Sequence, residues 1–303
     1  MFVSVLRLWL GELVFGCLEA ASARSVLEIG ALEGQMTEGL LEWGAGNGAR
    51  VVSVDPEPTE ALRRLQSKYP ELQVLAETSL EAIPRAPAFD SVIIDGDHNW
   101  FTVKSELEAI ADRTEADGSE WPVVLLHDLG WPLARRDSYS APDRIPEEFR
   151  QPFEFDVRLD PDQPGLAEGG LRFSSAAIRE GGPRNGTLTA VEDFLSTERA
   201  GGLRFALVPA FFGLGVIWPA SAPWSGEVER LLAPYDRNPL IARLEDNRLR
   251  HLAKRDVQTR MLERISKSGT FRVAESLSKI RNLGKPAVSG DDIDEAVGKA
   301  SSR

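Results

Sequence analysis

Short apolar runs alternate with amphipathic segments over the first 130 residues of the chain. The runs are four or five residues long and rich in Val, Ile and Leu, which is typical of buried strands. The predicted strands are Ser25–Ile29, Arg50–Val54, Gln73–Ala76, Asp90–Ile94 and Val123–Leu126, and the helices between them are Gln35–Trp43, Thr59–Tyr69 and Trp100–Ala111. Thr59 is a plausible N-cap of its helix. Strand and helix alternating at this pace predict a doubly wound parallel sheet with right-handed crossovers.

The pattern changes after residue 128. Residues 129–187 are rich in Pro, Gly, Asp and Arg, and a segment this long without periodicity is either a functional lid or a disordered insertion. Its aromatic residues favour an ordered lid: Trp131, Tyr139, Phe149, Phe153 and Phe155. A helix is predicted over Leu188–Leu195. Phe205–Pro209 and Leu214–Trp218 predict an antiparallel hairpin, which would complete a mixed sheet of about seven strands.

Helical segments are predicted at both ends of this α/β domain, which we place at residues 23–220. Residues 1–22 predict an amphipathic N-terminal helix, in which Arg7 and Glu12 interrupt an apolar stretch too short to span a membrane. Residues 221–285 predict a C-terminal helical extension whose long helix breaks near Gly269. Residues 286–303 are rich in Gly, Ser, Asp and Lys and predict a disordered tail.

Charge is distributed unevenly along the chain. Its 303 residues are 42% hydrophobic, enough for one sizeable core, and the net charge is -12. Residues 237–285 carry 13 Lys and Arg against 5 Asp and Glu, so the remainder is strongly acidic and no nucleic-acid partner is expected. The basic helical segment is expected to be a solvated face or a homo-oligomer contact. One cysteine, Cys17, excludes an intrachain disulfide and fits a cytoplasmic protein.

The loop after the first strand has glycines suited to a cofactor. Glu28 stands where a dinucleotide-binding fingerprint has its first glycine, and bulky Leu32 and acidic Glu33 separate Gly30 from Gly34. A pyrophosphate would meet these side chains, so a cationic, amino-acid-bearing cofactor suits the loop better. Glycine also permits an ordinary strand-to-helix turn, which is the competing interpretation.

Two further strands are followed by residues that could contact the ribose and adenine of such a cofactor. Asp55 ends the second strand, where an acidic side chain can accept hydrogen bonds from ribose hydroxyls. Thr78 and Ser79 follow the third strand, where an adenine edge could be read.

Two polar strand ends complete the candidate chemistry. One apolar strand ends in Asp95-Gly96-Asp97-His98 and the next in His127-Asp128. Because ligands bind beyond the carboxyl ends of strands in open α/β sheets, these side chains could hold a divalent cation and a general base. The competing interpretation is that Asp95 and Asp97 cap the helix that starts near Trp100.

Together these motifs resemble class I S-adenosylmethionine-dependent methyltransferases. Within that superfamily, the strand ends at Asp95 and His127 are similar to those of small-molecule O-methyltransferases related to macrocin O-methyltransferase and the cephamycin-pathway protein. The resemblance implies a Rossmann-like fold with a seven-stranded mixed sheet. It also implies cofactor contacts from the residues at four strand ends: Glu28, Gly30, Gly34, Asp55, Thr78, Ser79 and Asp95.

The same resemblance implies a metal and a base. Related sugar methyltransferases have Asp-x-x-His, which Asp95 and His98 match, followed by an acidic pair that binds magnesium. His127 stands where one acid is expected, and Asp128 matches the other. We predict Asp95, Asp128 and His127 as metal ligands and His98 as the base, with Asp97 as an alternative third ligand. An imidazole ligand would favour manganese over magnesium.

The predicted function is therefore transfer of a methyl group from S-adenosylmethionine to a hydroxyl of a small molecule, of the sugar or natural-product type. Alcohols are poor nucleophiles at neutral pH, so a metal and a base both aid this chemistry. The alternatives are a catalytically silent scaffold with the same fold, an N-methyltransferase, or another enzyme such as a hydroxylase.

Overall fold

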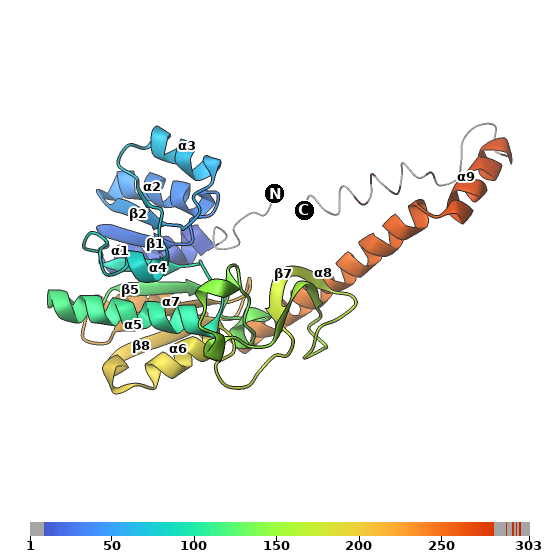
Figure 1. Ribbon diagram of the computed structural model, residues 1–303. Helices are drawn as coiled ribbons and strands as arrows, with labels where there is room; N and C mark the ends of the chain where they lie inside the picture. Colours follow the sequence, from blue (N-terminus) through green and yellow to red (C-terminus); the bar gives the residue numbers. More distant parts are fainter. Residues whose placement is uncertain (1–8, 282–288, 290–292, 294, 296, 298–303) are drawn as a thin grey trace. The chain divides into compact units, whose positions relative to one another are not determined.

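A computed structural model describes residues 9–281 together with 289, 293, 295 and 297. Within these residues the main sheet has seven strands in the order β3-β2-β1-β4-β5-β9-β8 (Figure 1). Their bounds are β1 Ser25–Ile29, β2 Arg50–Val54, β3 Gln73–Leu75, β4 Ser91–Ile94, β5 Val123–His127, β8 Leu203–Val208 and β9 Leu214–Pro219. β1 to β5 are parallel, whereas β9 is antiparallel to both of its neighbours. The predicted mixed α/β sheet is confirmed.

Helices cover both faces of this sheet. The helices of the domain are η2 Leu10–Val14, α1 Phe15–Ala20, α2 Gln35–Asn47, α3 Glu60–Lys68, α4 Ser79–Ala82, α5 Trp100–Asp117, α6 Thr187–Leu195 and α7 Ser225–Leu232. One apolar core joins η2, α1, α2, α3 and α7 to the sheet, and the other joins α4, α5 and α6. Figure 1 shows α5 and α6 side by side, consistent with their close packing. Burial on both faces explains why the central strands read as continuous apolar runs.

One of the two predicted helix N-caps is correct and the other is not. The Thr59 side chain accepts a hydrogen bond from the Leu62 amide at 3.3 Å, which confirms it as the N-cap of α3. By contrast, Asn99 caps α5 by accepting from the Thr102 amide at 2.8 Å. The interpretation of Asp95 and Asp97 as caps of this helix is therefore wrong, and their carboxylates are left for other partners.

Strand register brings the carboxyl ends of the parallel strands to a common level. Ile29 lies opposite both Val54 and Ile94, and Ile94 lies opposite Leu126. The residues that follow these four positions therefore lie in neighbouring rows at one edge of the sheet. That edge carries the polar residues singled out in the sequence, which is where open α/β sheets bind ligands.

The segment 129–187 contains two strands that we did not predict, although the first of them alternates regularly between apolar and polar residues. β6 (Phe153–Leu159) and β7 (Leu171–Ala177) form a separate two-stranded sheet. The buried carboxylate of Asp137 joins this segment to the start of α5 and to Gly186. That carboxylate accepts hydrogen bonds from the Trp100 amide at 2.7 Å, the Gly186 amide at 2.7 Å and the Tyr139 hydroxyl at 2.8 Å.

The C-terminal helices are α8 (Pro239–Ser266) and α9 (Gly269–Arg281), so the predicted break near Gly269 is confirmed. The chain divides into two compact units. The first holds the described residues up to Val157 with Phe173–Asp246, and the second holds Arg158–Arg172 with the described residues from Asn247 onward. Within the second unit, Asp256 pairs with Arg158 at 2.6 Å and with Arg260 at 3.0 Å.

Several predictions about the ends of the chain fall partly or wholly outside the described residues. These are the first part of the helix over residues 1–22 and nearly all of the tail over 286–303. The described part of the N-terminal segment, Leu10–Ala20, is helical and its Cys17 side chain is buried in the core. Among the described helices, none has the length and apolar content needed to cross a bilayer.

Gly30 provides a direct test of the way the strand ends meet. It has a φ of +89°, and a Cβ placed on it would lie 2.2 Å from the Asp95 carbonyl oxygen. We expect Gly30→Ala to lower the free energy of unfolding by several kcal/mol, because both the backbone angle and the contact become unfavourable. Urea unfolding followed by circular dichroism measures the change.

Gly46→Ala is the matched control, because Gly46 lies within α2 and a Cβ there meets nothing within 4 Å. It should be neutral or stabilise the protein by up to ~1 kcal/mol, since alanine favours helix. Equal unfolding free energies for Gly30→Ala and wild type would show that β1 and β4 do not approach in this way.

Candidate active site

The loop after β1 is tied to the ends of the neighbouring strands. Gly30 and Gly34 both have positive φ, at 89° and 78°, and Gly34 directly precedes α2. The Asp55 carboxylate at the end of β2 accepts from the Leu32 amide at 2.9 Å and from the Glu57 amide at 2.8 Å. The predicted cofactor residues Gly30, Gly34 and Asp55 therefore belong to one connected loop system, although one Asp55 oxygen already supports the loop itself.

Glu28 lies beneath this loop as a buried acid. Its Oε2 accepts hydrogen bonds from the Thr37 hydroxyl at 2.7 Å and the Ser53 hydroxyl at 2.5 Å, while Oε1 has no hydrogen-bond partner in the described part of the chain. Burial raises the pKa of Glu28 to about 7, and the two hydroxyls offset part of that effect. One oxygen is thus held by the protein, and the other is left without a hydrogen bond in a buried place where a donor would stabilise it.

Thr78 and Ser79 lie at the start of the short helix α4. Thr78 is the N-cap, and its amide and hydroxyl both donate to the Glu81 carboxylate, at 3.1 Å and 2.7 Å. Ser79 is buried and lies near a residue that sequence reasoning missed, Glu106 of α5. Thr78 is therefore occupied with its own helix, and Ser79 faces a buried acid.

Glu106 is fully buried, and neither of its carboxyl oxygens has a hydrogen-bond partner among the described residues. Burial raises its pKa to about 8, an effect that the nearby Ser79 hydroxyl offsets in part and the Asp97 charge increases. The sequence does hold a signal for it, since Glu106 shares helical spacing with the apolar side chains of Val103, Leu107 and Ile110.

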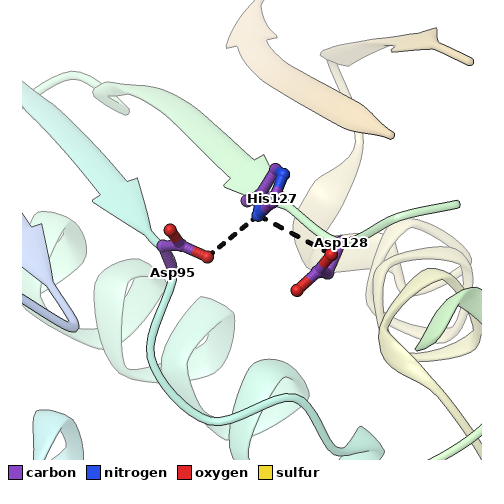
Figure 2. Close-up of side chains that lie close together, drawn as sticks. All are labelled: Asp95, His127 and Asp128. Carbon is purple, nitrogen blue, oxygen red and sulfur yellow. Dashed lines mark hydrogen bonds and ion pairs between the residues drawn. The ribbon is translucent and has the colours of Figure 1, made fainter. Parts of the chain in front are cut away.

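Three predicted ligands meet at the ends of β4 and β5. Because Ile94 and Leu126 are in register, Asp95 and His127 follow them side by side. His127 Nδ1 lies 3.0 Å from Asp95 Oδ1 and 3.7 Å from Asp128 Oδ1, and one ligand atom from each of the three side chains lies within 4.8 Å of the others. Figure 2 shows both carboxylates facing the same imidazole edge.

The environment of His127 fixes which nitrogen faces the carboxylates. Its side chain is 5% exposed, and its Nε2 lies 3.1 Å from the Phe211 carbonyl oxygen, which can only accept a hydrogen bond. Nε2 therefore carries a proton. Burial lowers the pKa of His127. The charges of Asp128 and Asp95 and the hydrogen bonds to Asp95 and Phe211 have a larger, opposite effect, so the pKa rises to about 10. The two carboxylates therefore favour the protonated form of His127.

His98 joins the same cluster from the loop after β4. Its Nε2 lies 3.4 Å from Asp128 Oδ2, and its backbone carbonyl accepts from the Ser138 amide at 2.9 Å. The two oxygens of Asp128 thus face different imidazoles, Oδ1 toward His127 and Oδ2 toward His98. Asp128 itself has a φ of 59°, an uncommon angle for a residue other than glycine.

Asp97 is not part of this cluster. Its Oδ2 accepts from the Thr102 hydroxyl at 3.4 Å and its Oδ1 from the Ser140 amide at 3.3 Å. The structure therefore brings together Asp95, His127, Asp128 and His98, and it turns Asp97 toward α5 and the segment that follows Ser138.

Replacing Glu106 tests whether this buried acid is neutral in the folded protein. The pKa of Glu106 in the folded protein is about 8, above its ordinary value of 4.5. The stability that the neutral acid contributes is therefore fully present below pH 4.5 and is lost as pH rises through 8. The difference in unfolding free energy between Glu106→Gln and wild type should grow over that range by a few kcal/mol. Chemical denaturation at several pH values measures it.

Glu108→Gln is the control for this comparison, because Glu108 is on the same helix but partly exposed and paired with Lys104. Its stability should follow the wild-type pH dependence. Parallel curves for Glu106→Gln and wild type would mean that Glu106 is ionised in the folded protein.

Comparisons with known proteins show what this chain is similar to. No protein of curated function matches the sequence. A Podospora anserina methyltransferase bound to SAH has 16% identity, with 68% of this chain and 76% of that chain covered and a TM-score of 0.42. Human N-acetylserotonin methyltransferase has 13% identity, coverage of 69% and 51%, and a TM-score of 0.37.

A third structure, a Burkholderia thailandensis 1,6-didemethyltoxoflavin-N1-methyltransferase, has 17% identity, coverage of 69% and 79%, and a TM-score of 0.33. All three scores are low, so the assignment depends on the family match instead. Residues 27–129 match the family described as a methyltransferase domain. This range contains Glu28, the glycine loop and the metal-ligand candidates, and it supplies the five parallel strands of the main sheet. Residues 27–129 are therefore similar to a methyltransferase domain, which supports an enzyme of the transferase class.

Proposed function

We propose that the protein transfers the methyl group of S-adenosylmethionine to a hydroxyl oxygen of a small molecule, with the help of a divalent metal. The acceptor class is a sugar or a natural product, as in the macrocin and cephamycin-pathway group. The observation that carries this proposal is the meeting of Asp95, His127, Asp128 and His98 at one sheet edge. A metal site and a base side by side are what a weakly acidic hydroxyl needs.

The cofactor would bind over the loop at Gly30 to Gly34. In this proposal Glu28 and the glycines contact its methionine and ribose part, Asp55 the ribose, and Ser79 or Thr78 the adenine. Asp95 belongs to both halves of the site, because its carbonyl oxygen lies directly against Gly30 while its carboxylate faces His127. This shared residue would set the transferable methyl group close to the acceptor.

The residues at the strand ends fit a divalent cation. His127 donates from Nε2 to the Phe211 carbonyl, which leaves Nδ1 as the ligand atom facing the two carboxylates. Metal-binding histidines are commonly held by such a second hydrogen bond. Asp95, Asp128 and His127 would hold the ion, which when bound would acidify the acceptor hydroxyl. Two oxygens and one nitrogen suit manganese as well as magnesium.

His98 would act as the general base. With its Nε2 directed at Asp128 Oδ2, the carboxylate orients the ring and stabilises it once it is charged. The proton of the acceptor hydroxyl would then go to His98 Nδ1. The side chain is 24% exposed, so it remains accessible from the solvent side of the sheet edge.

The predicted cytoplasmic location, the homo-oligomer contact through the C-terminal helices and the absence of a nucleic-acid partner stay predictions. The domain boundaries, at residues 23–220 and 221–285, also stay predictions.

Methyl transfer in the presence and absence of a chelator tests the proposed function. With isotope-labelled S-adenosylmethionine and a panel of hydroxylated sugars and phenols, label should appear in an ether linkage. Chelator should lower the rate at least about 100-fold, and added manganese or magnesium should restore it. Label on nitrogen would favour the N-methyltransferase alternative. No heat on titration with S-adenosylmethionine would refute the cofactor assignment.

Asp95→Asn and Asp97→Asn form a matched pair for the metal site, because each replaces one carboxylate of the same loop. Manganese binding, measured by calorimetry, should weaken about 10- to 100-fold in Asp95→Asn. It should remain close to wild type in Asp97→Asn, since Asp97 faces Thr102 and Ser140. The reverse result would make Asp97 the ligand.

His98→Ala tests the base separately from the metal. The rate of methyl transfer should fall about 10²–10⁴-fold, because the proton has no nearby acceptor. Manganese and S-adenosylmethionine affinities should be nearly unchanged, since the ligand cluster is intact. A near-normal rate would assign His98 to a structural role.

A further inference from the structure

The turn between β8 and β9 holds an unfavourable backbone conformation next to the candidate metal site. Two consecutive residues that are not glycine have left-handed angles, Phe211 with a φ of 45° and Phe212 with a φ of 68°. Such angles are costly and persist only where the surrounding contacts hold them. The mechanism above uses this turn through one atom, the Phe211 carbonyl oxygen.

That carbonyl is the acceptor for His127 Nε2. β5 and β9 are antiparallel with His127 opposite Leu214, so the turn before β9 lies beside the end of β5. The Phe211 carbonyl therefore accepts the hydrogen bond from His127 Nε2, and its direction orients the ring. If the turn relaxed to ordinary backbone angles, the carbonyl would rotate away and the ring would lose this constraint.

Backbone contacts hold one side of the turn. The Gly130 amide donates to the Phe212 carbonyl at 2.5 Å, and the Leu129 amide donates to the Gly213 carbonyl at 3.3 Å. These bonds tie the end of the turn to the segment after Asp128. They leave the amide of Phe212, between the two aromatic residues, for a different partner.

The partner is a side chain from the C-terminal helix α8. The Phe212 amide donates to Glu245 Oε1 at 2.9 Å, in a partly buried place. Glu245 lies 116 residues beyond the end of the family match at residue 129 and has no part in the chemistry proposed above. A charged acceptor makes a stronger bond to an amide than a neutral one, so it is well suited to hold an unfavourable turn.

We propose that Glu245 is a positioning residue for the active site. It fixes the Phe212 amide, the fixed turn directs the Phe211 carbonyl at His127 Nε2, and His127 Nδ1 is thereby presented to Asp95 and Asp128. The assignment of His127 as a metal ligand rests on the proposed function, but the effect of Glu245 on the His127 ring does not. α8 thus contributes to the site through the backbone of the turn.

Three variants test this proposal. Glu245→Ala removes the acceptor, whereas Glu245→Gln keeps an oxygen at the same position. Asp246→Ala removes the adjacent, exposed carboxylate of the same helix and controls for charge and helix propensity. Far-UV circular dichroism verifies the fold of each variant.

The first readout is nitrogen-15 NMR of the histidine rings in the metal-free protein, where only His98, His127 and His251 contribute. The Nε2 signal of His127 should change in Glu245→Ala and keep its wild-type position in Glu245→Gln and Asp246→Ala. The second readout is manganese affinity, which should fall about 10-fold in Glu245→Ala alone, as for other residues that support a ligand.

An unchanged His127 signal in folded Glu245→Ala would overturn the proposal. So would equal changes in Glu245→Ala and Asp246→Ala. If Glu245→Ala does not fold, Glu245→Asp replaces it, since it retains the charge but is one methylene too short, and the same outcomes apply. If the His127 signal responds as expected but the protein transfers no methyl group, Glu245 is still a positioning residue for the His127 ring. The proposed function is then refuted on its own.

Discussion

The pairing of Ile94 with Leu126 is the constraint on which the site depends. A shift of one residue between β4 and β5 would move Asp95 away from His127 and turn alternate side chains to the other face of the sheet. Both strands are buried on both sides, so their apolar residues pack against two helical layers and cannot slide without exposing them. Polar residues at the strand ends are held in place by apolar residues that have no chemical role.

The same edge concentrates groups whose charge is costly to bury. Glu28 and Glu106 have raised pKa values because burial disfavours their ionised forms, whereas the charges of Asp128 and Asp95 raise the pKa of His127 against the effect of burial. Perturbed groups of this kind gather at functional sites because ligand binding requires polar atoms that the protein itself does not satisfy. A cationic cofactor and a divalent metal are two ligands that would satisfy acidic groups here.

Much of this arrangement could be predicted from the sequence, because it depends on local patterns. The strands before Asp55, Asp95 and His127 are short apolar runs, and their order follows from regular alternation with helices. β6 alternates regularly between apolar and polar residues, but the Pro- and Gly-rich composition around it favoured an irregular lid, and so β6 and its partner β7 were not predicted. Glu245 could not be found, since its partner is a backbone amide and no side-chain pattern marks such contacts. The sequence did not decide which residue caps α5. Asn99 does so because it directly precedes the first residue of the helix, whereas Asp95 and Asp97 lie further away.

Asp128 places a limit on how this site can vary. Its Oδ1 lies 3.7 Å from Nδ1 of His127 and its Oδ2 lies 3.4 Å from Nε2 of His98, so one carboxylate charge faces two imidazoles. An asparagine of the same size would carry no charge and would turn its NH₂ group toward one of the two rings. In the proposed mechanism, the metal ligand and the group that orients the base are therefore the same carboxylate, and a substitution that alters one role also disturbs the other.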